Sequence, residues 1–127
     1  MNILALAYLG DAIYELYVRE HIIKTVRTGR ADIMHRAGVK YVCADGQADS
    51  VKAMIESGFL SEDEQGFVRR AHNHKTATKP KNADPVTYKW ATAFEALLGY
   101  LRLSGCEQRL KEIMQKAVEI TEGAEKQ

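Results

Sequence analysis

Two acidic residues lie in apolar stretches beside glycines, which is an unusual setting for a carboxylate. Asp11 follows Gly10 in an apolar N-terminal segment, and Glu95 precedes Gly99 by about one helical turn in a second apolar segment. A carboxylate on a core-facing stripe is costly unless it is hydrogen-bonded, paired or bound to a cation. A glycine inside a helix costs about 1 kcal/mol relative to alanine, and the close approach of another helix would explain it.

This pattern predicts two crossing helices whose acids, Asp11 and Glu95, meet at the crossing. Carboxylate oxygens of this kind suit Mg²⁺ or Mn²⁺, because such ions keep several waters and need only one or two protein carboxylates. A simpler interpretation is that each acid pairs with an Arg or Lys at a helix edge. The spacing alone favours this simpler interpretation.

A second feature is a cluster of basic residues. No acid occurs between Glu64 and Asp84, whereas several cationic or titratable residues do: Arg69, Arg70, Lys75, Lys79 and Lys81, with His72 and His74 among them. Such a cluster is typical of a polyanion-binding surface in a protein without overall basic charge. A solvated loop that lysines keep soluble is an equally good interpretation. The two histidines lack a third ligand nearby, so they do not predict a metal site.

Composition limits the classes of protein that fit. The 127 residues, 46% of them hydrophobic, correspond to one domain, and the formal charge of +1 excludes a uniformly basic protein. No apolar run approaches the roughly 18 residues of a membrane span, and the N-terminus does not resemble an export signal. Only two cysteines occur, Cys43 and Cys106, which is consistent with a reducing compartment. We therefore expect a cytoplasmic protein with no membrane association.

Helical periodicity dominates the chain, and no alternating run rich in Val, Ile and Thr favours a strand. The sequence predicts one all-α domain, a helical bundle, over residues 1–122, with a frayed tail at residues 123–127. Within the domain we expect helices at residues 2–24, 32–37, 42–56, 61–72 and 85–104, a last amphipathic helix around residues 110–120, and a polar loop at residues 73–83.

Several residues mark the ends of these helices. Gly58 and Gly105 are placed to end helices, Gly58 in a left-handed cap. Ser61 and Glu64 have the spacing of a capping box. Asp84 is a candidate N-cap that is followed by proline at the first helical position.

The first helix is expected to bury one stripe, formed by Leu4, Ala7, Asp11, Tyr14, Val18 and Ile22. The first helix also has more apolar side chains than one hydrophobic core needs, because three others lie beside this stripe: Ile13, Leu16 and Tyr17. A partner subunit would account for them, and a helix that is buried on all sides would account for them equally well.

Two segments resemble motifs of the ribonuclease III family. Residues 6–15, LAYLGDAIYE, are similar to the family's signature helix, and residues 92–99, TAFEALLG, are similar to its second catalytic motif. The segments occur in the family's order and at roughly its separation. Residues 75–82 between them, KTATKPKN, and the absence of a double-stranded-RNA-binding domain resemble the short bacterial branch, the Mini-ribonuclease III group. The resemblance covers nearly the whole chain.

The resemblance implies a helical, homodimeric endonuclease domain that needs Mg²⁺, with Mn²⁺ as the alternative metal, and that cuts double-stranded RNA. On the short branch the implied substrate is precursor ribosomal RNA of the large subunit (23S), and a ribosomal protein is a further partner that the resemblance admits. Six residues are the implied RNA contacts: Lys75, Lys79, Lys81, Asn82, Arg69 and Arg70. A capping role in the loop is the alternative for Asn82.

Matched position by position, Asp11 and Glu95 correspond to metal-binding catalytic acids of the family. Larger members carry Glu where this chain has Ala7 and Asp where it has Thr92, so the number of bound metals stays open. The two missing acids also leave open a catalytically silent RNA- or ribosome-binding module on the same fold. A helical interaction protein without an RNA role is a third class. The presence of both remaining acids in apolar surroundings favours the enzyme.

Overall fold

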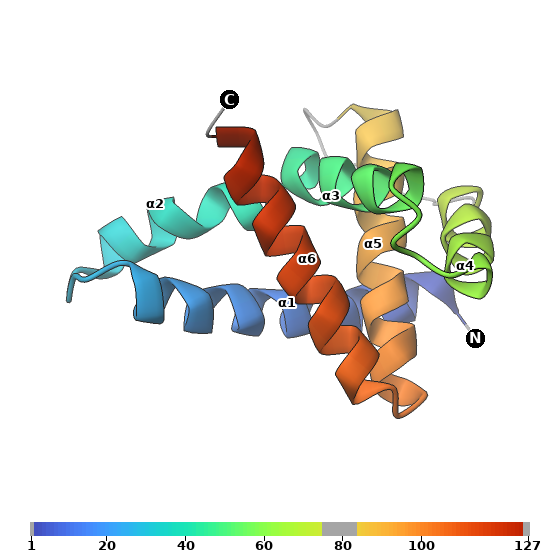
Figure 1. Ribbon diagram of the computed structural model, residues 1–127, viewed down its shortest axis with the longest axis horizontal. Coiled ribbons are helices and arrows are strands. Elements are labelled where there is room, and N and C mark those ends of the chain that lie inside the picture. Colours follow the sequence, from blue (N-terminus) through green and yellow to red (C-terminus); the bar gives the residue numbers. More distant parts are fainter. Residues whose placement is uncertain (1, 75–83, 126–127) are drawn as a thin grey trace.

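A computed structural model of the chain describes residues 2–74 and 84–125 (Figure 1). Six helices account for most of these residues: α1 (Ile3–Thr25), α2 (Ala31–Val42), α3 (Ala44–Glu56), α4 (Glu62–His72), α5 (Pro85–Leu103) and α6 (Glu107–Glu125). No strand occurs within the described ranges. The prediction of an all-α domain is confirmed.

Helix α5 crosses the first half of α1, and these two helices share the most extensive contact of any pair (Figure 1). Two glycines allow the crossing to be close. A Cβ on Gly10 would collide with the backbone carbonyl oxygen of Glu95, and a Cβ on Gly99 would collide with that of Leu6. The expectation that both glycines permit a close helix approach is therefore confirmed.

The core is built around this crossing. The rings of Tyr14 and Phe94 meet edge to face with centroids 5.0 Å apart, and both side chains are fully buried. Helices α3, α4 and α6 pack around α5, while α2 packs against the second half of α1 (Figure 1). Their largest buried side chains include Val51, Met54, Val68, Leu97, Leu98, Leu110 and Ile113. Side chains from the other four helices therefore pack against the pair formed by α1 and α5.

The predicted signals at the helix ends are confirmed where they fall on described residues. Gly58 and Gly105 adopt positive φ angles of 75° and 76°, the left-handed conformation that glycine accepts without steric cost. Ser61 and Glu64 form the reciprocal capping box, with hydrogen bonds of 3.1 and 2.8 Å. The Asp84 side chain accepts from the backbone N–H of Thr87 at 3.1 Å and so caps α5.

The second and third helices differ from the expected boundaries. The short helix predicted at residues 32–37 is wrong in length, because α2 continues through Gly38 to Val42. Gly38 stays helical in a position where it packs against α1: a Cβ there would lie 3.7 Å from Val18 Cγ1. Cys43 alone separates the two helices, as the C-cap of α2 and the N-cap of α3. At the other end of the chain, α6 remains helical to Glu125, beyond residue 122.

The predicted buried stripe of α1 is wrong at two positions. Leu4 and Asp11 are exposed, whereas Leu6, Gly10 and Ile13 are buried together with Ala7, Tyr14, Val18 and Ile22. The reason is tertiary: α5 crosses at Gly10, so the residues flanking Gly10 on that side form the buried face. Asp11 lies at the margin of the contact and reaches solvent.

An ion-pair clamp joins α4 to α6. The guanidinium of Arg109 donates to both carboxylate oxygens of Glu64, at 2.9 and 2.8 Å, and to the backbone carbonyl of Phe59 at 2.7 Å. These charge-assisted hydrogen bonds hold the pKa of Glu64 below its usual value. The clamp therefore stabilises the folded state most when Glu64 is ionised.

Two further observations concern the membrane and the thiols. Of the helices in residues 2–74 and 84–125, none combines the length and apolar character that a membrane crossing requires. Cys43 and Cys106 both carry free thiols.

Candidate active site

Asp11 and Glu95 lie together beside the α1–α5 crossing. Both line a hollow of about 270 Å³, which is also lined by Leu4, Ala7, Tyr8, Tyr88 and Thr92. Gly10 sets their proximity, because its contact with the backbone of Glu95 brings the residue that follows it, Asp11, next to that glutamate. Asp11 is exposed and Glu95 is half-buried. The structure therefore brings the two predicted acids to one site, although only one of them is withdrawn from solvent.

The surroundings of Glu95 disfavour its negative charge. Burial, the charge of Asp11 and a hydrogen bond with Asp11 together raise the pKa of Glu95 to about 8. A hydrogen bond from Gln47 acts in the opposite direction. Without a cation, Glu95 is therefore mostly protonated at neutral pH. A positive ion placed between the two carboxylates would remove this penalty.

Gln47 is a part of the site that sequence reasoning missed. It belongs to α3, is only 3% exposed, and its Nε2 donates to Oε2 of Glu95 at 3.4 Å. One signal could have pointed to it: Gln47 shares the helical spacing i, i+3, i+4, i+7 with Ser50, Val51 and Met54, all of which are buried. A glutamine on a core-facing stripe needs a polar partner, as Asp11 and Glu95 were argued to need.

The donor set of the hollow fits a hard divalent cation. The hollow offers carboxylate oxygens from two helices, and within the described part of the chain no three His, Cys, Asp or Glu side chains converge to hold a metal. Mg²⁺ and Mn²⁺ accept one or two protein carboxylates and complete their shells with water, whereas structural zinc requires four nitrogen or sulfur ligands. The accessible hollow beside Asp11 provides room for such waters.

The two positions that depart from the acids of larger ribonucleases III also line this hollow. Ala7 and Thr92 are both buried, at 7% and 5% exposed, on the faces of α1 and α5 that meet there. Both side chains therefore lie beside Asp11 and Glu95. The lining carries two carboxylates, those of Asp11 and Glu95, and the match of Ala7 and Thr92 to acids of larger family members stays a prediction.

The basic residues are not brought into the hollow by the described structure. Arg69 and Arg70 are exposed on α4, where the Arg70 guanidinium lies 6.0 Å from the centre of the Phe67 ring. Lys75, Lys79, Lys81 and Asn82 fall outside the described residues. His72 packs its ring on Trp90, with centroids 4.1 Å apart, an arrangement typical of a packing role.

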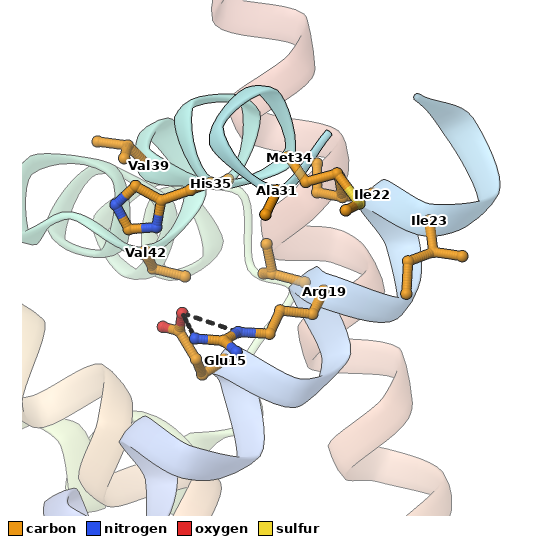
Figure 2. A pocket seen from close by; sticks show the side chains of 11 residues that line it. Glu15, Arg19, Ile22, Ile23, Ala31, Met34, His35, Val39 and Val42 are labelled. Carbon is orange, nitrogen blue, oxygen red and sulfur yellow. Dashed lines mark hydrogen bonds and ion pairs between the residues drawn. The ribbon is translucent and has the colours of Figure 1, made fainter. Parts of the chain in front are cut away.

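A larger hollow lies elsewhere, between α1 and α2. It measures about 360 Å³, is mostly apolar, and has the ion pair of Glu15 and Arg19 at one edge (Figure 2). Ile23 of α1 and Val39 of α2 line it and are large exposed apolar residues. Among the apolar residues of α1 that the sequence predicted to be more than one core needs, Ile13 is buried and Leu16 is 60% exposed. This groove has the character of a contact surface and lacks the paired acids of the first hollow.

Comparisons with known proteins agree with this picture. The family model described as Ribonuclease III domain matches residues 4–105. The chain is 43% identical to the Mini-ribonuclease 3 of Enterococcus faecalis over 90% of this chain and 86% of that protein, and 44% identical to the Mini-ribonuclease 3 of a Thermoanaerobacter species over 94% and 82%. It is also similar to a crystal structure of a Fusobacterium nucleatum protein, with a TM-score of 0.78 and 30% identity over 93% of this chain and 92% of that one.

Proposed function

The chain belongs to the ribonuclease III family, and from this premise we propose that it is a metal-dependent endoribonuclease that cuts double-stranded RNA at Asp11 and Glu95. The observation that carries the proposal is the meeting of these two carboxylates in one accessible hollow, where burial and mutual repulsion raise the pKa of Glu95. A site that disfavours its own negative charge is suited to a cation.

In this proposal Asp11 and Glu95 hold the metal, which is Mg²⁺ with Mn²⁺ as a substitute. When bound, such an ion supplies an activated water and stabilises charge on the scissile phosphate. Glu95 contributes from a nearly fixed backbone position, and Asp11 contributes from the solvent side. Thr92, one turn before Glu95 in the lining, would offer its hydroxyl as a hydrogen-bond partner for water at the site.

The RNA would be bound by the basic cluster and recognised by duplex shape. We assign this role to Lys75, Lys79, Lys81 and Asn82, with Arg69 and Arg70 of α4. Double-stranded RNA is read mainly through phosphates and 2′-hydroxyls, so lysine-rich segments suit it without base-specific contacts. The similarity to Mini-ribonucleases 3 supports an enzyme of the short branch. We propose that it is cytoplasmic, with precursor 23S ribosomal RNA as its substrate and a ribosomal protein as an accessory partner, as the resemblance of its motifs implies.

We further propose that the enzyme is a homodimer with two-fold symmetry. One chain supplies one acid pair, whereas cutting both strands of a duplex in a single encounter requires two centres. Exposed apolar residues on α1 and α2, namely Leu16, Ile23 and Val39, support a contact between copies. Light scattering at micromolar concentration should give about twice the 14.3 kDa mass of one chain. A mass of one chain would contradict the dimer.

The alternative is a catalytically silent RNA-binding module on the same fold, which Ala7 and Thr92 favour. Cleavage of duplex RNA with and without Mg²⁺ separates the two. We expect metal-dependent cleavage by the wild type and none by Asp11→Asn, because the amide retains the shape but lacks the charge that holds a hard cation. Glu20→Gln, which changes an exposed acid of α1 outside the hollow, is the matched control and should cleave normally. Parental activity in Asp11→Asn would refute the assignment.

A further inference from the structure

A third helix contributes a polar side chain to the acid pair. Only three polar or charged residues of the described chain are buried, and two of them, Gln47 and Thr92, lie at the site while the third, Ser50, does not. A buried amide without a hydrogen-bond partner costs several kcal/mol in an apolar setting, so its partner indicates what it is placed to do. For Gln47 that partner is Oε2 of Glu95, at 3.4 Å.

The backbone fixes where Gln47 sits. Cys43 joins α2 directly to α3, and its Sγ accepts from the backbone N–H of Gly46 at 3.4 Å. A Cβ on Gly46 would collide with the backbone carbonyl oxygen of Lys40, so the first turn of α3 is packed directly against the end of α2. Gln47 is the next residue. Its position therefore depends on main-chain contacts and not on the flexibility of a loop.

Glu95 is fixed in a similar way on the opposite side. Its backbone carbonyl touches Gly10, which leaves the carboxylate as the part of the residue free to rotate. A donor on one carboxylate oxygen restricts that rotation and leaves the other oxygen for a ligand. In metal sites, partners that hydrogen-bond the ligating side chains in this way commonly contribute 10- to 100-fold in metal affinity.

We propose that Gln47 is a positioning residue that holds the Glu95 carboxylate in the orientation needed to bind a divalent cation together with Asp11. The inference rests on the proposed metal-dependent function, and it adds a residue from α3 to a site otherwise made by α1 and α5. Gln47 itself contacts neither the RNA nor the metal. Its effect is transmitted through Glu95.

The test measures Mn²⁺ binding directly, by calorimetry and by electron paramagnetic resonance of free Mn²⁺, on the full chain without RNA. Gln47→Met keeps the length of the side chain and removes the donor, and Gln47→Ala is a second variant in case the thioether packs poorly. The matched control is Ser50→Ala. Ser50 is equally buried on the same helix, but its Oγ bonds to the carbonyl of Ala117 and to Thr121 on α6.

We expect both Gln47 variants to raise the dissociation constant for Mn²⁺ by 10-fold or more, an estimate from similar partners in other metal sites. The Mg²⁺ concentration for half-maximal cleavage should rise by a similar factor, and saturating metal should restore most of kcat. Ser50→Ala should lose stability without losing Mn²⁺ affinity. Wild-type affinity in both Gln47 variants, with Asp11→Asn unable to bind, would overturn this inference alone. A wild-type protein that binds no Mn²⁺ would overturn the metal site and the inference with it.

Discussion

Replacing Glu95 with glutamine should stabilise the metal-free protein while abolishing catalysis. Burial and the neighbouring charge of Asp11 raise the pKa of Glu95 from 4.5 to about 8, so folding at neutral pH forces the carboxylate to take up a proton. The unfolded chain carries no such requirement. The substituted glutamine would fill the same space, donate to Asp11 and carry no charge in either state.

The size of the effect follows from linkage. Each pH unit between the two pKa values costs the folded state about 1.4 kcal/mol, and pH 7 lies about 2.5 units above the ordinary pKa of 4.5. The penalty is therefore about 3 kcal/mol at pH 7 and less than about 1 kcal/mol at pH 5. Because the folded-state pKa of an acid is raised, the penalty is absent below about pH 4.5, grows as the pH rises, and levels off above about pH 8.

Thermal melts in a chelator at pH 5, 6, 7 and 8 would measure it. For a domain of this size 1 kcal/mol corresponds to about 4 °C, so Glu95→Gln should melt about 10 °C above the wild type at pH 7 and only a few degrees above it at pH 5. Glu20→Gln should show no such trend, since Glu20 is exposed. Addition of Mg²⁺ should raise the Tm of the wild type and of Glu20→Gln, which keep both acids of the hollow, but not that of Glu95→Gln. A difference that is absent, or that shrinks as the pH rises, would refute the reasoning.

Three further predictions test the crossing, the clamp and the basic cluster. Gly10→Ala should cost about 2–3 kcal/mol, because the new Cβ meets backbone that cannot move aside, whereas Gly123→Ala in open space on α6 should be neutral or stabilising; denaturant titration distinguishes them. The stability advantage of the wild type over Glu64→Gln should be full above about pH 5 and be lost as the pH falls below 4.5 through the lowered folded-state pKa of Glu64; melts that show no pH dependence would contradict this. A triple alanine variant should weaken duplex binding and reduce the salt slope of binding by about 2–3; the three residues changed are Lys75, Lys79 and Lys81. An unchanged salt slope would show that the RNA contacts lie elsewhere.

Local chemistry explains which parts of the fold could be predicted. The capping box of Ser61 and Glu64, the N-cap of Asp84 and the left-handed glycines at Gly58 and Gly105 each depend on a few neighbouring residues, and all of them occur in the structure. The crossing of two glycine-bearing helices was also predictable, because a glycine in an apolar helix points to a close neighbour. Each of these features is determined by residues that lie within a few positions of it in the sequence.

Features that depend on tertiary placement were not predictable in this way. The burial of Asp11 was expected from its place in an apolar stripe, but the side on which α5 crosses decides which residues of α1 are covered, and Asp11 lies at the edge. The contribution of Gln47 depends on a contact across 48 positions in the chain, which no local motif contains. In both cases the relevant information is the angle and register of two packed helices.

The same packing explains how a lining with only two carboxylates could hold a hard cation. Ala7 and Thr92 line the hollow at positions where the sequence match predicts acids in larger family members, so this site has less negative charge to attract a cation. It also avoids placing further carboxylates beside Glu95, whose ionisation is already opposed by burial and by Asp11. With fewer ligands, metal affinity must depend more on how firmly each one is held. The backbone contact of Glu95 with Gly10 and its hydrogen bond from Gln47 supply that restraint, which makes the helix crossing part of the proposed metal site and not merely its support.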